Sequence, residues 1–453
     1  MRALNLLVLS FLASALTAAA ENRIVCYFGS WANWRPGNGK FVTADIDTSL
    51  CTHFIWTFVT LQGNQVVSSN GEGVNGLREF IQLREKNPSA KFLVAIGGAV
   101  DSHGPKYSNM VSTASSRKQF IDSTVALLKQ YKFDGFDVDW EYPTRNGGVP
   151  ADRNNFVLLL KELKERFTQE GGLLLTAAVA AGTWTASQAY DIRAISQHLD
   201  FVNIMTYDFA GSWEPRTGHH AGLRGDLSVE SCVKYWLDQG CPKEKLVVGV
   251  PTYGKTWTLA DANNNAPGAP APSAGQAGPY VREAGSLGYN ELCEQIREGQ
   301  WTLRFDEKAR APYAIKGNQW LSYDNVKSVT EKANYIKEQR LGGAMIWSIE
   351  TDDKSGACGE KFPILKALNA VLRGGQPVQQ SPAPTPTPKT AEAPKDSPSP
   401  TAGQCTKAGN IADPSSCGYI TCVDNGAGGF TRYQRQCAPG LCYKASADYC
   451  DRP

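Results

Sequence analysis

Short apolar runs alternate with helix-like segments along the first 375 residues, and this alternation is the strongest constraint on the fold. Eight runs rich in β-branched and aromatic residues are predicted to be strands: Ile24–Phe28, His53–Val59, Phe92–Ile96, Gly135–Asp139, Leu173–Val179, Phe201–Met205, Leu246–Val250 and Ala344–Trp347. Helical segments separate them, among them Asn75–Lys86, Ser116–Tyr131, Asp152–Gln169, Val229–Gln239 and Asn325–Arg340. The pattern predicts an α/β fold, a (β/α)8 TIM barrel. A doubly wound sheet is the alternative, but no glycine-rich nucleotide fingerprint follows the first run.

One connection is too long for a plain barrel. Nearly seventy residues, about 254–321, separate the seventh strand from its helix. Within them, Leu287–Ile296 and Trp301–Tyr313 follow stretches rich in proline and glycine. We therefore expect a small α+β insertion after strand 7. At the C-terminal face of the barrel, it would form one wall of a groove.

The N-terminus predicts the compartment. Arg2 precedes an apolar run, Leu4–Leu16, that is too short to span a bilayer, and Ala18–Ala20 resembles a cleavage site. Residues 1–20 are therefore predicted to be a signal peptide, and the protein to be secreted and extracellular. A membrane anchor is the alternative, but no later stretch reaches 18 uninterrupted apolar residues.

The C-terminal part changes composition. Residues 376–403 are a linker rich in Pro, Thr and Ser, and they separate the barrel region, 21–375, from a tail at 404–453. Half of the twelve cysteines lie in this tail: Cys405, Cys417, Cys422, Cys437, Cys442 and Cys450. A segment this short needs cross-links, so we expect a small disulfide-rich domain. A zinc site is the alternative, but no histidine follows His220.

The predicted fourth strand carries three carboxylates with a spacing of two. Asp137, Asp139 and Glu141 therefore share one face, whereas Asp134 has the opposite parity and is expected to be structural. Like charges side by side raise one another's pKa, which indicates a tuned proton donor at Glu141. The alternatives are a solvated acidic loop or a metal site. A loop would not interleave Phe136 and Val138 so regularly, and metal sites usually recruit histidine.

Composition indicates a neutral ligand. The 46 basic and 44 acidic residues nearly cancel, so bulk charge gives no reason to expect binding to nucleic acid or to a membrane. Eleven tryptophans indicate flat apolar binding surfaces. We expect a monomer.

These motifs resemble a known family. The run Asp134–Glu141 matches the DxxDxDxE motif of family 18 glycoside hydrolases, and Tyr142-Pro143 extends the match to animal chitinases. The resemblance covers residues 22 to about 375 and includes Ile96-Gly97-Gly98, Met205-Thr206-Tyr207-Asp208, Gly211-Ser212-Trp213-Glu214, Pro251-Thr252-Tyr253-Gly254 and Trp347. It implies an endochitinase that hydrolyses β-1,4 bonds between N-acetylglucosamine units with retention and with substrate assistance, without metal or cofactor.

The resemblance also implies residue roles. Glu141 protonates the leaving oxygen, Asp139 stabilises the oxazolinium formed by the sugar's acetamido group, and Asp137 is the charge partner of Asp139. Tyr207 donates to the acetamido group. Chitin and chitooligosaccharides would be bound by Tyr27, Trp31, Phe58, Gly97, Gly98, Tyr142, Met205, Asp208, Trp213 and Trp347, because sugar faces pack on aromatic rings.

Several positions depart from this family's pattern. Ala99 replaces the tryptophan that usually follows the Gly-Gly pair, and it removes a stacking platform that typically serves the leaving-group side. Ala210 and the stretch His219–Ala221 also differ. The family's disulfide positions are matched by the pairs Cys26 with Cys51 and Cys293 with Cys358. A pair between Cys232 and Cys241 is a further guess.

The tail resembles peritrophin-type chitin-binding domains in Asp413–Tyr419, Cys437–Leu441 and Cys450–Pro453. Cys442 stands at an unusual place, so the usual pairing is not assigned. The tail has no tryptophan, and its stacking candidates are Tyr419, Phe430, Tyr433, Tyr443 and Tyr449. Two alternatives to the endochitinase stay open. One is a chitin-binding lectin on the same fold, and the other is an enzyme that acts on the chitobiose core of glycoproteins.

Overall fold

The computed structural model describes residues 22–68 and 73–376 and, of the C-terminal part, 405, 409–413, 417, 419–424, 430–435, 437, 442–444 and 449–451. The predicted signal peptide therefore lies outside the described residues, as does almost all of the linker. The chain divides into two compact units, Met1–Pro386 and Thr387–Pro453. Among the described residues no helix is long and apolar enough to cross a membrane.

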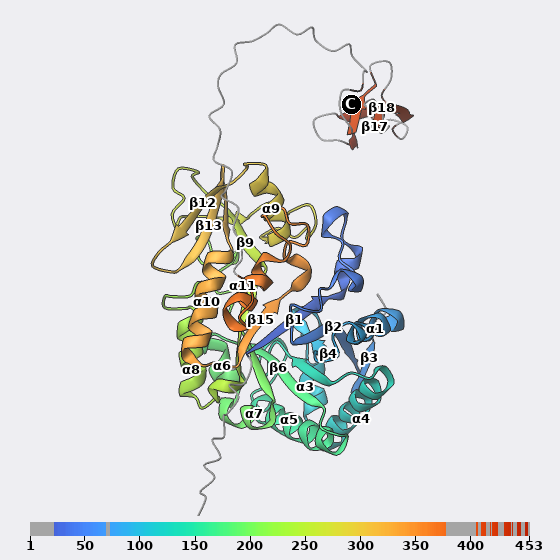
Figure 1. The fold of residues 1–453 in the computed structure, drawn as a ribbon, viewed down its shortest axis with the longest axis vertical. Helices are drawn as coiled ribbons and strands as arrows, with labels where there is room; N and C mark the ends of the chain where they lie inside the picture. Colours follow the sequence, from blue (N-terminus) through green and yellow to red (C-terminus); the bar gives the residue numbers. More distant parts are fainter. Residues whose placement is uncertain are drawn as a thin grey trace, which may run out of the picture. The chain divides into compact units, whose positions relative to one another are not determined.

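The first unit is built on a closed ring of eight parallel strands (Figure 1). Their order is β1, β15, β8, β7, β6, β5, β4 and β2, and β2 pairs with β1 to close the ring. The strands are β1 Arg23–Gly29, β2 His53–Gln62, β4 Lys91–Gly97, β5 Gly135–Asp139, β6 Leu174–Ala180, β7 Phe201–Met205, β8 Leu246–Pro251 and β15 Gly343–Trp347. Every predicted strand overlaps one of these, and the predicted (β/α)8 barrel is confirmed.

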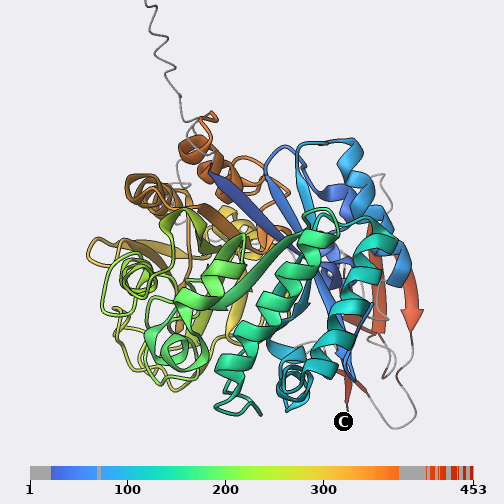
Figure 2. The same ribbon diagram turned by 90° about the horizontal axis from the view of Figure 1, so that it is seen from below.

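Helices lie outside the strand ring (Figure 2). They are α1 Gly73–Gln82, α2 Gly98–Asp101, α3 Lys106–Val111, α4 Ala114–Tyr131, α5 Asp152–Gln169, α6 Thr183–Ala189, α7 Ile192–His198, α8 Val229–Asp238, α10 Val326–Gln339 and α11 Pro363–Leu372. A short strand, β3 Gln65–Ser68, pairs antiparallel with β2. The five helices predicted from the sequence all form, and the bounds of α5 match the prediction.

Two apolar cores follow from the alternation of side chains along the strands. In β5, Phe136 and Val138 belong to the large core between the strands and the helices. A smaller core fills the barrel interior and includes Val25, Leu93 and Val247. Asp137 and Asp139 have the parity opposite to Phe136 and Val138, so they lie on the inner side of the strand. The spacing of two thus separates the carboxylates from the outer core.

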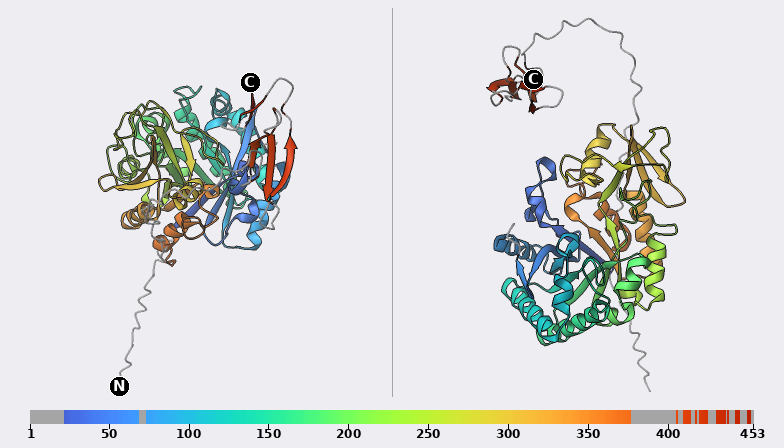
Figure 3. Two further views of the ribbon diagram at one scale, coloured as in Figure 1. Left: turned by 90° about the horizontal axis from the view of Figure 1, so that it is seen from above. Right: turned by 180° about the vertical axis from the view of Figure 1, so that it is seen from behind.

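The long connection after β8 forms the α+β insertion. Its sheet has the order β10, β9, β14, β13 and β12, with β11 paired to β9. The elements are β9 Tyr253–Thr258, β10 Ser273–Ala274, β11 Ser286–Gly288, α9 Tyr289–Arg297, β12 Thr302–Asp306, β13 Ala311–Lys316 and β14 Gln319–Ser322. Figures 1 and 3 show α9, β12 and β13 gathered at one end of the barrel unit. Trp257 and Trp320 are fully buried in the insertion's own small core.

Two disulfides cross-link the barrel unit. They join Cys26 to Cys51 and Cys293 to Cys358, the two pairs that the family resemblance implies. The guessed pair of Cys232 and Cys241 is wrong, because both are buried free thiols. The two sulfurs have different neighbours: Cys232 contacts Ser231 and the Ser228 backbone, whereas Cys241 contacts Ser196 and the Pro242 carbonyl oxygen.

The second unit is a small β domain. Strands β16 Gly409–Ala412, β17 Tyr419–Asp424 and β18 Phe430–Arg435 form one antiparallel sheet, and β19 Cys442–Lys444 pairs with β20 Tyr449–Asp451. Disulfides join Cys405 to Cys422 and Cys417 to Cys442. Cys442, which stood at an unexpected place in the sequence, is thus a partner of Cys417. The expected disulfide-rich domain is present.

Candidate active site

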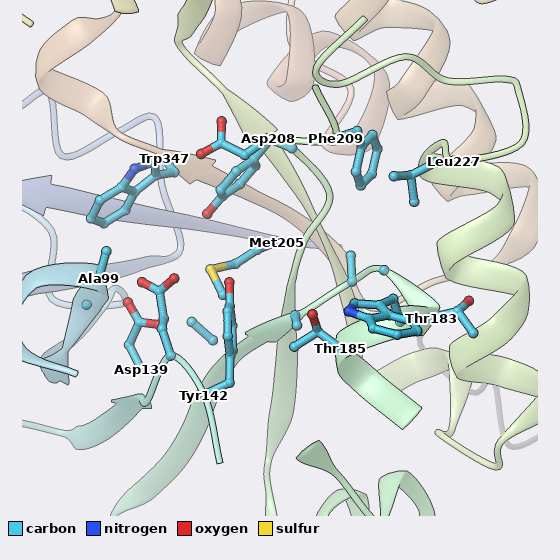
Figure 4. Close-up of a pocket in the computed structure, with 18 of the residues that line it drawn as sticks. Ala99, Asp139, Tyr142, Thr183, Thr185, Met205, Asp208, Phe209, Leu227 and Trp347 are labelled. Carbon is cyan, nitrogen blue, oxygen red and sulfur yellow. The ribbon is translucent and has the colours of Figure 1, made fainter. Parts of the chain in front are cut away.

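A cavity of about 670 Å³ opens where the barrel strands end. Its lining comes mainly from the segments that follow β4, β5, β6 and β7 and from Trp347, the last residue of β15. Figure 4 shows Trp347, Ala99 and Asp139 toward one end, Thr183 and Leu227 toward the other, and Tyr142 and Met205 between them. The insertion supplies none of the lining residues, although it was expected to form a wall; its Lys255 instead lies behind Asp208, with Nζ 3.4 Å from Oδ1.

Asp137 lies at the bottom of the site and is completely buried. Its carboxylate accepts hydrogen bonds from Tyr27 Oη at 2.8 Å and from Thr176 Oγ1 at 2.5 Å. Asn203 Nδ2 donates to Tyr27 Oη at 2.9 Å and extends this network. Burial raises the pKa of Asp137 to about 6, although the three hydrogen-bonding neighbours oppose that rise. Asp137 is thus a held carboxyl that does not line the cavity.

Asp139 ends β5 and lines the cavity, with only 4% of its surface exposed. Its Oδ1 is buried and has no hydrogen-bond partner in the described part of the chain. Burial raises the pKa of Asp139 well above its usual range, and the charges of Glu141 and Asp137 add to the rise. Gly97 permits this strand end to come close, because a Cβ at Gly97 would lie 2.0 Å from the Asp139 carbonyl oxygen.

Glu141 lies two residues beyond the end of β5 and is half-buried. Its backbone is fixed, since its N–H donates to Ser102 Oγ at 2.9 Å and its carbonyl accepts from Asn146 Nδ2 at 3.0 Å. Burial raises the pKa of Glu141 to about 7; the charge of Asp208 adds to the rise, and a hydrogen bond with Tyr142 opposes it. The group is therefore partly protonated at neutral pH, as a general acid requires.

Tyr207 and Asp208 follow β7 and form the opposite side of the site. Tyr207 Oη has a weak contact to Met345 Sδ at 3.9 Å. Asp208 Oδ1 accepts from Tyr253 Oη at 2.6 Å and lies 3.6 Å from His220 Nδ1. His220 is completely buried, and burial lowers its pKa. Contacts with His220, Lys255 and Tyr253 lower the pKa of Asp208 although burial opposes this, so the carboxylate is charged at neutral pH.

Aromatic rings cover the end of the cavity at β15. Trp347 packs edge-on against Tyr27, with ring centroids 5.6 Å apart, and lies 5.9 Å from Phe58. Phe58 presses on Gly98, where a Cβ would meet the ring at 2.7 Å, so the glycine leaves room for it. Trp31 stacks on Phe58 at 6.0 Å and is 40% exposed, but it does not line the cavity. Trp31 therefore extends the aromatic surface outside the cavity.

The predicted binding residues are thus mostly brought together. Of the predicted catalytic and binding residues, the cavity lining lacks only Asp137, Gly97 and Trp31. Asp137 and Gly97 support Asp139 from behind. Asp134 has the structural place expected for it, because its Oδ2 accepts from Arg84 Nη2 and from the Phe92 N–H, each at 2.7 Å.

Sequence reasoning missed Trp184. This residue lies in α6, just after β6, lines the cavity and is 75% exposed. The guanidinium of Arg145 lies 5.5 Å from its ring centroid, and Arg145 Nη2 donates to its carbonyl oxygen at 3.2 Å. The other aromatic groove residues were predicted because they lie at or just after a predicted strand. Trp184 meets the same criterion and could have been predicted in the same way.

One cluster has the composition of a metal site. Cys293, Asp353 and Cys358 form the single such group among the described residues. Its two sulfurs are bonded to each other, so no thiolate is available. Asp353 Oδ2 accepts from the Cys358 N–H at 2.7 Å and stabilises the loop. This cluster is a structural cross-link.

The arrangement is suited to protonating a leaving group in a neutral ligand. A partly protonated Glu141 lies beside the cavity, two buried carboxyls lie behind it, and aromatic rings line one end. The buried carboxyls can balance a positive charge that develops next to them. The aromatic walls favour flat, apolar ligand faces over charged ones.

Comparison with known proteins gives a consistent result. The family model for glycosyl hydrolases family 18 matches residues 23–352. An endochitinase of Manduca sexta is 38% identical over 422 residues, which is 86% of this chain and 75% of that protein. Among solved structures, the Ostrinia furnacalis Group IV chitinase is 42% identical with a TM-score of 0.76, over 78% of this chain and 100% of that one. Human YKL-39, described as a pseudo-chitinase with retained chitooligosaccharide binding, is 37% identical with a TM-score of 0.73, over 78% and 100%.

Proposed function

Because the chain belongs to glycosyl hydrolases family 18, we propose that it is a secreted endochitinase. It would hydrolyse the β-1,4 bonds between N-acetylglucosamine units of chitin by a retaining, substrate-assisted reaction. The observation that carries the proposal is Glu141, whose pKa is raised to about 7 at the edge of an aromatic cavity. A lectin would not require a proton donor in this position.

In the first step of the proposed reaction, Glu141 gives its proton to the glycosidic oxygen, and the carbonyl oxygen of the sugar's acetamido group attacks the anomeric carbon. The bond to the leaving sugar breaks, and a cationic oxazolinium forms. Asp139 would balance this charge with its carboxylate, and the neighbouring Asp137 would act on Asp139 as a nearby charge. Tyr207 Oη donates to the acetamido group. Trp347 is the floor on which this sugar packs.

In the second step, Glu141 acts as the base. It takes a proton from water, whose oxygen attacks the anomeric carbon on the face that the leaving sugar vacated. The oxazolinium ring opens, and the acetamido group is restored. The product keeps the β configuration, and Glu141 is protonated again for the next cycle. No step uses a metal or a cofactor.

The direct test is hydrolysis of a soluble chitohexaose by the full chain. Release of shorter chitooligosaccharides with retained β configuration supports the proposal. Binding without cleavage would instead support the second candidate, a chitin-binding lectin, which the likeness to the pseudo-chitinase YKL-39 favours. Ala99 keeps this candidate relevant, because the alanine leaves only an exposed methyl group in the cavity wall.

The pH profile is expected to depend on Asp208. Its negative charge raises the pKa of Glu141, so Asp208→Asn should lower that pKa. Since the reaction needs Glu141 protonated, kcat/KM should fall as pH rises through about 7 in the wild type. In Asp208→Asn, this fall should begin at lower pH. The measurement is kcat/KM for a chromogenic chitobioside across pH 4 to 9. An unshifted alkaline limb would contradict the expectation.

Trp184 is expected to bind the part of the substrate that extends away from Trp347. Figure 4 shows Thr183, the residue before it, toward the end of the cavity remote from Trp347. Removing an exposed stacking ring costs about 1–2 kcal/mol, so Trp184→Ala should raise KM for chitohexaose roughly five- to thirtyfold. Chitobioside substrates should be affected less. Trp34→Ala is a matched control, because this tryptophan is 69% exposed and does not line the cavity. Equal KM values for chitohexaose in wild type and Trp184→Ala would refute the role.

We further propose that the tail binds chitin and that residues 1–20 direct secretion. Tyr419 and Phe430 are partly exposed, and Tyr419 stacks on the largely buried Tyr443, with ring centroids 4.9 Å apart. The side chains of Tyr433 and Tyr449 lie outside what the structure describes.

A chain that ends at Pro386, the end of the first unit, should adsorb less to insoluble chitin than the full chain. It should cleave chitohexaose at the same rate, because the tail adds local concentration and no catalytic contact. Undiminished adsorption would contradict a binding role for the tail.

Detection of the full chain in the medium of secreting cells, with the first residues removed, tests the signal peptide.

A further inference from the structure

A second cavity lies entirely within the insertion. Its volume is about 370 Å³, which falls within the range of cavities that hold small ligands. Residues of β9, β11, α9, β13 and β14 line it, together with the segment 276–279 and with Glu298, Gln300 and Trp301 between α9 and β12. It shares no lining residue with the cavity that contains Glu141. None of its groups takes part in the reaction proposed above.

The walls of this second cavity combine amides with one indole ring. Four glutamines line it, from four separate places in the insertion: Gln276, Gln295, Gln300 and Gln319. Trp301 is half-buried, and its Nε1 donates to Gln295 Oε1 at 2.8 Å, which fixes the ring. Lys316 Nζ donates to the same oxygen at 3.2 Å and to Gln300 Oε1 at 2.5 Å. Trp301, Gln295, Gln300 and Lys316 thus form one connected group, which we call the Trp301 cluster.

The carboxylates around the cavity are already engaged by the protein. Glu291 is 1% exposed, and it accepts from the N–H groups of Tyr280, Val281 and Gly288 at 2.5, 3.0 and 2.7 Å. Glu294 accepts from Asn38 Nδ2 at 2.8 Å and from Tyr280 Oη at 2.6 Å. Donors of the protein already hold both carboxylates, so neither carboxylate needs a bound cation.

Charge excludes an anionic ligand. Three glutamates, with Glu298 as the third, face one lysine around the cavity, so a phosphate or a sulfated polymer would be repelled.

Amide side chains offer both donors and acceptors, which matches hydroxyl groups that do both. The Gln295 Nε2 group has no hydrogen bond within the described ranges, and Thr256 Oγ1, in a residue that is 3% exposed, has none either. An indole face packs well on the C–H groups of a sugar ring.

We propose that the insertion carries a second, non-catalytic binding site for a neutral saccharide, one or two pyranose units long, centred on the Trp301 cluster. The sugar packs on the Trp301 ring, and its hydroxyl groups hydrogen-bond to Gln295 Nε2 and to the Gln300 amide, which is held in place by Lys316 at its oxygen and by Glu298 at its nitrogen. Such a site binds a chain end or a separate strand of polymer without cleaving it. This site stands independently of the reaction proposed for Glu141, because the two cavities share no residue.

The test is hydrogen–deuterium exchange on the full-length Glu141→Gln chain, which prevents hydrolysis of the probe. N,N′-diacetylchitobiose at about ten times its dissociation constant should slow the opening of a ligand-stabilised segment roughly tenfold. Slowed exchange is expected in peptides that cover α9 to β12 and the turn between β13 and β14. Trp301→Ala and Gln300→Ala in the same background should abolish it. Gln300 is exposed and outside the helices and strands, so Gln300→Ala should not disturb folding. A loss of protection in this variant would therefore reflect lost binding.

Further arms of the experiment separate the ligand classes. Cellobiose in place of N,N′-diacetylchitobiose tests whether the acetamido groups matter, and protection by either sugar supports a neutral saccharide site. Protection by inorganic phosphate or by the cationic glucosamine disaccharide alone would overturn it. The absence of protection in the insertion, at concentrations that protect the peptides around Glu141, would also overturn it. Trp184→Ala, which alters the other cavity, should leave protection in the insertion unchanged.

Discussion

Replacing Glu141 by glutamine is expected to lower kcat for chitohexaose by roughly 10²–10⁴-fold, the contribution typical of a positioned general acid. Glutamine has nearly the same shape but holds no transferable proton, and Glu141 is proposed to act as acid in one step and as base in the next. Binding should survive, because the aromatic walls of the cavity are unchanged. The measurements are kcat from reducing-end release and the dissociation constant from calorimetry on the same variant.

A matched control separates this effect from a general loss of charge. Glu165→Gln alters an exposed glutamate on α5 that is 3.9 Å from Lys161, so it should leave kcat unchanged. If the wild type hydrolysed chitohexaose only at the background rate of Glu141→Gln, the proposed enzymatic function would be refuted and the lectin favoured. A Glu141→Gln chain that keeps most of its kcat would show that another group is the acid.

Asp139→Asn should be the second most damaging change, with kcat lower by roughly 10²–10³-fold, as when one preorganised stabilising group is removed. Asparagine keeps the size of the side chain but cannot become an anion beside the cationic oxazolinium. Burial and its carboxyl neighbours already hold the pKa of Asp139 well above its usual range. The positive charge on the sugar lowers the pKa of Asp139 in the proposed reaction and so favours its ionised form.

Asp134→Asn provides the control for this second prediction. Asp134 lies five residues earlier on the same motif but has the opposite parity, and its partners are Arg84 and the Phe92 backbone. Its replacement should lower the melting temperature and leave kcat intact. If Asp134→Asn reduced kcat as much as Asp139→Asn, the proposed division between the inner and outer faces of β5 would fail.

The fold was predictable because a barrel repeats one simple pattern. Each strand is more apolar than the segments that flank it in the sequence, so all eight were predicted. The pairing of β1 with β2 and with β15 then follows from the closed ring. The carboxylates at Asp137, Asp139 and Glu141 were equally accessible, because a spacing of two determines which face of a strand a side chain occupies.

Other features depend on distances that the sequence does not contain. Trp31 was expected in the groove, yet it stacks on Phe58 outside the cavity, because the 3₁₀ turn at Ser30–Trp34 carries it beyond the end of β1. Cys232 and Cys241 were paired on spacing alone, yet both are free thiols, Cys232 within α8 and Cys241 beyond its end. The network from Asp137 through Tyr27 to Asn203 joins three strands and could not be inferred from any one of them.

The position of β15 has a consequence for how the chain is made. The ring closes only when β15 pairs with β1 on one side and β8 on the other, and β15 ends at Trp347. A growing chain therefore cannot complete its barrel until nearly all of the first unit has left the ribosome. The Cys26–Cys51 cross-link spans 25 residues and is available early, whereas Cys293–Cys358 spans 65 and must wait for the last segment. Until then, the edges of β1 and β8 are unpaired. The incomplete sheet is therefore the intermediate most prone to misassembly and most dependent on chaperones.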